Sequence, residues 1–123
     1  MLESSEIEIV EVSSGPEVFA HLKHSDVDLA ILDMQIGAMG GMAICLDLRH
    51  EESYGAIDHV PVLMLLDRRP DVFLARRSGA EGFVVKPLDP QRVRRAVREL
   101  LRGGLFEDDA WKPATVRVGV LDA

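Results

Sequence analysis

The sequence predicts an α/β fold in which a parallel sheet is doubly wound, with helices on both faces, giving three layers. Residues 29–32 and 61–66 are short, continuously apolar runs, as expected of strands that are covered on both faces. Stretches with helical spacing separate these runs, and strands that alternate with single helices form right-handed parallel crossovers. Asp33 and Asp67 follow the two runs, so their carboxylates fall at the edge of the sheet where such folds carry out their chemistry.

The first part of the chain contains a predicted edge strand and two helices. Residues 6–12 alternate charged and β-branched side chains, the period-two pattern of a strand with one wet face. A hydroxyl cap and an early proline follow, so we expect a helix over residues 16–24. After the strand that ends at Asp33, glycines make a loop, and apolar residues at helical spacing predict a helix over residues 42–52.

The second half continues the alternation of strands and helices. A helix that opens at Pro70 is predicted to end near Ser78, where glycines precede a brief strand over residues 83–85. Asp89 supplies an N-cap for the last helix, which is predicted over residues 90–101 and carries a continuous apolar stripe. Two glycines then end this helix.

Composition and charge place the chain among folded domains. With 123 residues, of which 47% are hydrophobic and 28% charged, it has the size and apolar content of one domain. A formal net charge of -7 argues against attraction to nucleic acid or to an anionic membrane surface. No signal peptide opens the sequence, no apolar run approaches about 18 residues, and Cys45 is the single cysteine. We therefore expect a cytoplasmic protein that does not enter a membrane.

Several segments, taken in order, resemble the response-regulator receiver family of two-component signalling. One apolar strand ends in Asp33, a second occupies residues 61–66, and Gly-Ala-Glu-Gly at residues 79–82 precedes a strand that ends in Lys-Pro. The resemblance covers about residues 7–101. It implies a doubly wound, flavodoxin-like fold and a signalling domain that acts in a phosphorelay.

The resemblance assigns roles to three residues. Asp33 corresponds to the phosphoacceptor, whose carboxylate takes a phosphoryl group from a histidine kinase. Lys86 corresponds to the lysine whose ammonium, together with magnesium, balances the charge that develops. Family members hold this lysine beside a cis proline, so the resemblance implies a cis bond before Pro87.

Two neighbouring positions depart from the family pattern. Leu66 stands where the family has a threonine or serine whose hydroxyl bonds the phosphoryl group, and an isobutyl group cannot donate a hydrogen bond. Asp67 stands where a small residue is common, and its charge would repel a phosphoaspartate. We therefore expect an atypical receiver or a pseudo-receiver with altered switching.

The chain begins at what resembles the family's second strand, so residues 1–102 are predicted to form a receiver-like domain without the usual first strand and helix. Residues 103–114 are predicted to be a linker, and residues 115–123 have the pattern of a first strand that ends in an acid, Asp122. This strand can complete the sheet in cis, as in a circular permutant, or by exchange between the copies of a homodimer. Either way Asp122 would approach Asp33 and help to bind magnesium. The alternative is that the chain is a fragment and that this segment pairs elsewhere.

The sequence leaves three functions open. The first is a stand-alone receiver whose output runs through protein contact, and the second is a pseudo-receiver that binds partners without phosphorylation. The third is a small enzyme on the same fold, but it lacks a convincing nucleophile and base pair, so we expect no enzymatic activity. The last helix has a basic side that includes Arg95, Arg98 and Arg102. We expect this side to face solvent or to contact a protein partner, and not nucleic acid.

Overall fold

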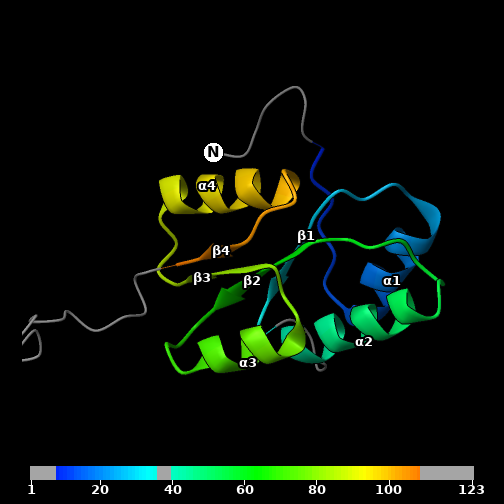
Figure 1. The fold of residues 1–123 in the computed structure, drawn as a ribbon, viewed down its shortest axis with the longest axis horizontal. Coiled ribbons are helices and arrows are strands. Elements are labelled where there is room, and N and C mark those ends of the chain that lie inside the picture. Colours follow the sequence, from blue (N-terminus) through cyan, green and yellow to red (C-terminus); the bar gives the residue numbers. More distant parts are fainter. Residues whose placement is uncertain (1–7, 36–39, 109–123) are drawn as a thin grey trace, which may run out of the picture.

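The computed structural model describes residues 8–35 and 40–108, which build one parallel, four-stranded sheet with helices packed on it (Figure 1). The elements in chain order are α1 (Gly15–His24), β1 (Ala30–Asp33), α2 (Gly41–Ser53), β2 (Val62–Leu66), α3 (Asp71–Ser78), β3 (Gly82–Val85), α4 (Pro90–Leu101) and β4 (Phe106–Glu107). The strand order is β1-β2-β3-β4, so each strand pairs with the next one along the chain. None of the helices in these residues is long and apolar enough to cross a membrane.

Helices cover both faces of the sheet and form the three layers that the sequence predicts (Figure 1). Helices α1, α2 and α3 lie on one face, over a core that includes Ile44 and Val72. Helix α4 lies on the other face, where Val97 belongs to a second core. Successive residues of β2 point to opposite layers, because Met64 belongs to the first core and Leu63 to the second. The α/β prediction with a sheet covered on both faces is confirmed.

The predicted helices begin and end within one residue of the observed ones, and their caps show why. Ser14 Oγ accepts a hydrogen bond from Glu17 N (3.4 Å) at the start of α1. Asp89 Oδ1 accepts one from Gln91 N (2.8 Å) at the start of α4. Each contact satisfies a backbone donor that has no partner inside its helix.

The predicted edge strand over residues 6–12 is wrong over the residues that the structure describes. Residues 8–13 belong to no helix or strand, and residues 6 and 7 lie outside the described part. The cause is a missing neighbour, because within residues 8–35 and 40–108 no strand pairs with the outer edge of β1. A strand without a neighbour forms no ladder hydrogen bonds, so the alternating pattern alone does not hold it in place.

The expected linker over residues 103–114 begins with ordered structure. β4 runs parallel to β3, and Phe106 N donates a hydrogen bond to Glu81 O (3.1 Å). Asp108, directly after β4, is fully buried. The sequence pattern missed β4 because two residues are too few to show a period.

The predicted strand over residues 115–123, including Asp122, lies outside the described residues. Completion of the sheet in cis and exchange between two copies both depend on this segment. Both therefore stay predictions.

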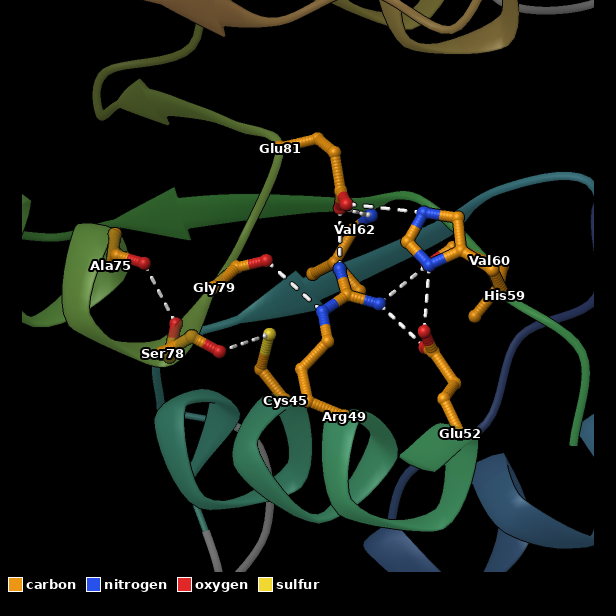
Figure 2. A network of polar contacts seen from close by, with 10 residues as sticks. All are labelled: Cys45, Arg49, Glu52, His59, Val60, Val62, Ala75, Ser78, Gly79 and Glu81. Carbon is orange, nitrogen blue, oxygen red and sulfur yellow. Dashed lines mark hydrogen bonds and ion pairs between the residues drawn. The ribbon is translucent and has the colours of Figure 1, made fainter. Parts of the chain in front are cut away.

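At the amino-terminal edge of the sheet, Arg49 of α2 ties together the chain segments that lead into β2 and β3 (Figure 2). Arg49 Nε donates to Gly79 O (3.0 Å) and Nη1 donates to Val60 O (2.9 Å). Nη2 pairs with Glu81, whose Oε1 also accepts a hydrogen bond from Val62 N (2.8 Å). These contacts hold α2 against the starts of β2 and β3. They therefore help to fix the positions of both strands, including their ends at the opposite edge of the sheet.

Candidate functional site

Three neighbouring strands end at one edge of the sheet, and a charged side chain stands at each end. Asp33 is the last residue of β1, Asp67 follows β2, and Lys86 follows β3. The strands are parallel, so these ends lie side by side. The structure thus brings together Asp33 and Lys86, which are 53 residues apart in the sequence.

Lys86 lies between two carboxylates. Its Nζ is 2.8 Å from Asp33 Oδ2 and 2.9 Å from Asp67 Oδ1, so one ammonium group donates to both aspartates. The three side chains are 31% to 38% exposed, and Asp33 is the most exposed of them. The Asp33 carboxylate is therefore held by a cation and is still reachable from solvent.

The contacts with Lys86 set the protonation states of this group. Burial alone would raise the pKa of Asp33, but the hydrogen bonds from Lys86 Nζ and Gln35 N and the charge of Lys86 lower it below its ordinary value. The hydrogen bonds that Lys86 donates to Asp33 and Asp67 raise the pKa of Lys86. Asp33 and Lys86 are therefore both ionised near neutral pH, and an ionised carboxylate is the form that acts as a nucleophile.

The start of α2 positions the backbone at Asp33. Gln35 N donates to Asp33 Oδ1 (2.9 Å), and Gly41 N donates to Met34 O (3.0 Å). A Cβ on Gly41 would lie 2.5 Å from Asp33 O and 2.8 Å from Met64 Sδ. Glycine is therefore required where the helix approaches the end of β1 this closely.

The turn after β3 is anchored to the end of β2. Lys86 N donates to Leu66 O (2.8 Å), and the peptide bond between Lys86 and Pro87 is cis, the arrangement that the family resemblance implies. The Leu66 side chain is fully buried in the core under α2 and α3. The switch position therefore gives the site no hydroxyl group and is filled by a core side chain.

The carboxylates at this edge determine which ion the site can hold. Within residues 8–35 and 40–108, no group of three or more histidine, cysteine, aspartate or glutamate side chains is arranged to hold a metal ion. Proteins commonly bind Mg²⁺ through one or two carboxylates, with water and phosphate oxygens completing the shell. Asp33 and Asp67, which share one ammonium, supply two such carboxylates and fit this donor set. Asp122, which the sequence predicts as a ligand, lies outside the described residues.

Sequence reasoning missed Asp108, which supports the end of β3. Its buried carboxylate accepts a hydrogen bond from Val85 N (2.9 Å) and pairs with Arg92 Nη1 (3.0 Å). Val85 directly precedes Lys86, so this contact helps to fix the backbone that carries the site lysine. One acid within a run of three acidic residues gives no sequence signal of burial, because aspartate is mostly exposed in proteins.

A pocket opens beside Lys86, and several of the side chains that line it are positively charged. It is lined by Asp67, Arg69, Val85, Lys86, Pro87 and Arg92. Arg68, which follows Asp67, pairs with Asp71 through Nη2 (3.2 Å), and its side chain is 72% exposed. Arg68 is not among the residues that line the pocket, whose positively charged side chains are those of Arg69, Lys86 and Arg92.

The sequence is similar to bacterial signalling proteins. A family model described as the response regulator receiver domain matches residues 1–98. An uncharacterized response regulatory protein of Mycobacterium tuberculosis is 40% identical over 93 residues, which are 76% of this chain and 67% of that protein. The sensory transduction protein RegX3 of Mycolicibacterium smegmatis is 30% identical over 112 residues, which are 89% of this chain but only 46% of that protein.

Solved structures share the fold. The signal receiver domain of a signal transduction histidine kinase from Syntrophus aciditrophicus matches with a TM-score of 0.69 over 93% of this chain and 83% of that chain, at 24% identity. The Vibrio cholerae chemotaxis protein CheY4 matches with a TM-score of 0.64 over 76% of this chain and 78% of that chain, at 23% identity. At these identities the likeness establishes a common architecture, and the chemistry has to be argued from the side chains.

Proposed function

Because the chain belongs to the response regulator receiver family, we propose that it is a phosphorelay domain in which Asp33 accepts a phosphoryl group from a histidine kinase. The observation that carries this proposal is the 2.8 Å contact between Lys86 Nζ and Asp33 Oδ2. An ionised, partly exposed carboxylate beside a lysine at the carboxyl end of β1 is suited to attack on phosphorus.

The proposed transfer needs one bond to form and one to break. An oxygen of the Asp33 carboxylate bonds to phosphorus while the P–N bond of the donor phosphohistidine breaks, and the electron pair of that bond stays with the imidazole, which takes a proton. Lys86 Nζ lies where it can balance negative charge on the transferred phosphoryl oxygens. Magnesium held by Asp33 and Asp67 would supply further positive charge at the same place.

Asp67 and Leu66 modify this chemistry. Asp67 occupies one donor of Lys86 at 2.9 Å and adds a negative charge next to the position of the phosphoryl group. A phosphoryl group on Asp33 would therefore be less well neutralised than one beside a lysine with a single carboxylate partner. Leu66 offers no hydroxyl to read the modification, so the response of the helices is expected to be weak.

Output through protein contact is part of the proposal. The outer side of α4 exposes basic side chains from Arg94, Arg95, Arg98 and Arg102. In a chain of net charge -7 these arginines form a local basic surface, which suits an acidic protein partner. On this proposal the domain acts in the cytoplasm as a signalling module and does not turn over a free substrate.

A second candidate is a pseudo-receiver that binds its partners without phosphorylation. Two observations favour it: Leu66 fills the switch position from within the core, and Lys86 already has two carboxylate partners. In this case Asp33, Lys86 and Asp67 would serve to hold three strand ends together.

Beryllofluoride, which mimics a phosphoryl group on aspartate, separates the two candidates. We expect NMR amide shifts at the ends of β1, β2 and β3 when beryllofluoride and magnesium are added to the wild type, and none in Asp33→Asn. Asp58→Asn removes a carboxylate from an exposed position on the loop before β2, and this control is expected to respond like the wild type. A wild type that shows no Asp33-dependent shifts would leave the pseudo-receiver as the function.

A further inference from the structure

Strand β4 is short and has one neighbour in the part of the chain that the structure describes, β3. Phe106 N donates to Glu81 O (3.1 Å) and Asp108 N donates to Phe83 O (3.3 Å). So few backbone hydrogen bonds on one side hold a strand weakly. The docking of β4 on the sheet therefore depends on its side chains.

Two acidic side chains join β4 to helices on opposite faces of the sheet (Figure 1). Glu107 pairs with Arg76 of α3, at 2.7 Å from Nη2 to Oε1, and both side chains are about half exposed. Asp108 pairs with Arg92 of α4, at 3.0 Å from Nη1 to Oδ2, and Asp108 is fully buried. A buried carboxylate is stable only while its partners are in place. The contacts of Asp108 therefore form and break together with the docking of β4.

The carboxylate of Asp108 also contacts the backbone of the candidate site. Its Oδ2 accepts a hydrogen bond from Val85 N (2.9 Å), and the next residue, Lys86, donates from its N to Leu66 O (2.8 Å). Arg92, the partner of Asp108, lines the pocket beside Lys86. The backbone that carries the site lysine is thus held from one side by β2 and from the other by Asp108.

The position of Lys86 matters for the chemistry of Asp33. Lys86 Nζ lies 2.8 Å from Asp33 Oδ2, the distance of a direct hydrogen bond. A group displaced by about 1 Å from its productive position can slow a reaction by about 100-fold. When β4 leaves the sheet, Val85 N loses the Asp108 carboxylate and the turn at Lys86 is held from one side only. The docked and undocked forms of β4 therefore differ in how firmly they place the site lysine.

We propose that Asp108 is a positioning residue for phosphoryl transfer to Asp33, and that the docking of β4 is coupled to the state of Asp33. The inference rests on the proposed function, because the coupling concerns a phosphoryl group on Asp33. Coupling between two binding events is reciprocal. If docked β4 favours a phosphoryl group beside Lys86, that group favours docked β4 by the same factor. Strand β4 would then report the modification, although Leu66 supplies no hydroxyl group.

Hydrogen exchange in the wild type tests the coupling without any substitution. We expect beryllofluoride and magnesium to slow exchange at the amides of Phe106 and Asp108 by about fivefold or more, measured by NMR. The amide of Ser25, which donates to His21 O at the end of α1, serves as the control and should be unchanged. If beryllofluoride binds and the two β4 amides exchange as before, Asp108 has a structural role only. That result would overturn the inference and leave the proposed function in place.

The affinity for beryllofluoride tests Asp108 itself. At saturating magnesium, NMR titration is expected to give an affinity for Asp108→Asn that is about fivefold or more below that of the wild type. Glu107→Gln makes the same change of charge on β4 without a contact to Val85, and it should bind nearly as the wild type does. Val72→Ala loosens the buried core on the other face, so it shows what a loss of stability alone does. An Asp108→Asn affinity equal to that of these controls would contradict the positioning role.

A third measurement needs no phosphoryl mimic. In Asp108→Asn the amide of Lys86, which donates to Leu66 O, should exchange faster than in the wild type and in Val72→Ala, because one support of the turn is gone. An unchanged exchange rate at Lys86 would overturn the inference, whether or not Asp33 accepts a phosphoryl group. A wild type that does not respond to beryllofluoride at all would instead remove the proposed function, and the coupling with it.

Discussion

At the scale of single residues, the site is defined by one ammonium group between two carboxylates. Lys86 Nζ contacts Asp33 and Asp67 at nearly equal distances, 2.8 and 2.9 Å, so the trio carries two negative charges and one positive charge. Asp33 is predictable from the sequence as a carboxylate that ends an apolar strand, and Lys86 follows from the Lys-Pro turn. The competition of Asp67 for the same lysine depends on tertiary positions and is visible only in the structure.

Removing Asp67 should lengthen the life of a phosphoryl group on Asp33. In Asp67→Ala, Lys86 keeps Asp33 as its one carboxylate partner, and a negative charge near the phosphoryl group is removed. We expect this to change the activation free energy for loss of the phosphoryl group by about 1 kcal/mol, or its rate roughly fivefold. We expect slower loss of the phosphoryl group after acetyl phosphate is removed, measured by intact mass at saturating magnesium. Asp47→Ala, an equal charge change at an exposed position on α2, serves as the control. An unchanged or shorter lifetime would count against the role of Asp67.

The contacts of Lys86 also predict how stability depends on pH. The pKa of Asp33 is lowered by folding, so its contribution to stability is present above the unfolded value near 4 and is lost as pH falls through the folded pKa. Lys86→Met removes the cation that lowers this pKa. We expect its melting temperature to lie below that of the wild type at pH 7, and the difference to shrink mainly as pH falls below about 4, toward the lowered folded pKa of Asp33.

Lys86→Met should lower the free energy of unfolding by less than about 1 kcal/mol at pH 7. The loss is small because about one third of each side chain in the trio is exposed to solvent. Differential scanning calorimetry at several pH values between about 7 and 2 measures it. A difference that is constant over this range would mean that ionised Asp33 is not what Lys86 stabilises.

At the scale of elements, the sequence predicts those whose signals are local. Helices α1 and α4 carry their own side-chain caps, and β1 and β2 have continuous apolar runs, so the boundaries agree within one residue. Residues 8–12 and β4 behave differently, because a strand forms only where a neighbour is present and its own pattern does not reveal that neighbour. In the described part of the chain no strand lies beside the first segment, whereas β3 pairs with β4.

Gly41→Ala should disturb the junction between β1 and α2. The added methyl group would lie 2.5 Å from Asp33 O, so helix and strand end would have to separate, at a cost of about 1–3 kcal/mol in the free energy of unfolding. Urea denaturation measures the loss. Gly55→Ala has open space around its added Cβ and bears only the cost of its positive φ, about 1 kcal/mol. Equal losses in the two variants would argue against the close approach at Gly41.

Asp108→Asn should weaken the attachment of β4. The variant removes the charge that pairs with Arg92 and weakens the acceptor for Val85 N in a fully buried position, which is expected to cost about 2–4 kcal/mol. Glu107→Gln alters a half-exposed ion pair with Arg76 and should cost less than Asp108→Asn. Urea denaturation of both variants tests the difference. A loss in Asp108→Asn no larger than in Glu107→Gln would contradict the role of the buried carboxylate.

At the scale of the whole molecule, a doubly wound sheet places the charged side chains of the site at one edge, where its parallel strands end. Residues distant in the sequence, Asp33 and Lys86, meet because parallel strands end together, and this convergence follows from the predicted fold class. Within residues 8–35 and 40–108, the strand order leaves no strand on the outer side of β1, beside the site.

The most direct test of the phosphoacceptor role is intact-mass spectrometry after incubation with acetyl phosphate and magnesium. We expect the wild type to gain one phosphoryl group that maps to Asp33, Lys86→Met to gain it more slowly, and Asp33→Asn to gain none. A wild type that gains no phosphoryl group, or an Asp33→Asn variant that still gains one, would contradict the assignment of Asp33.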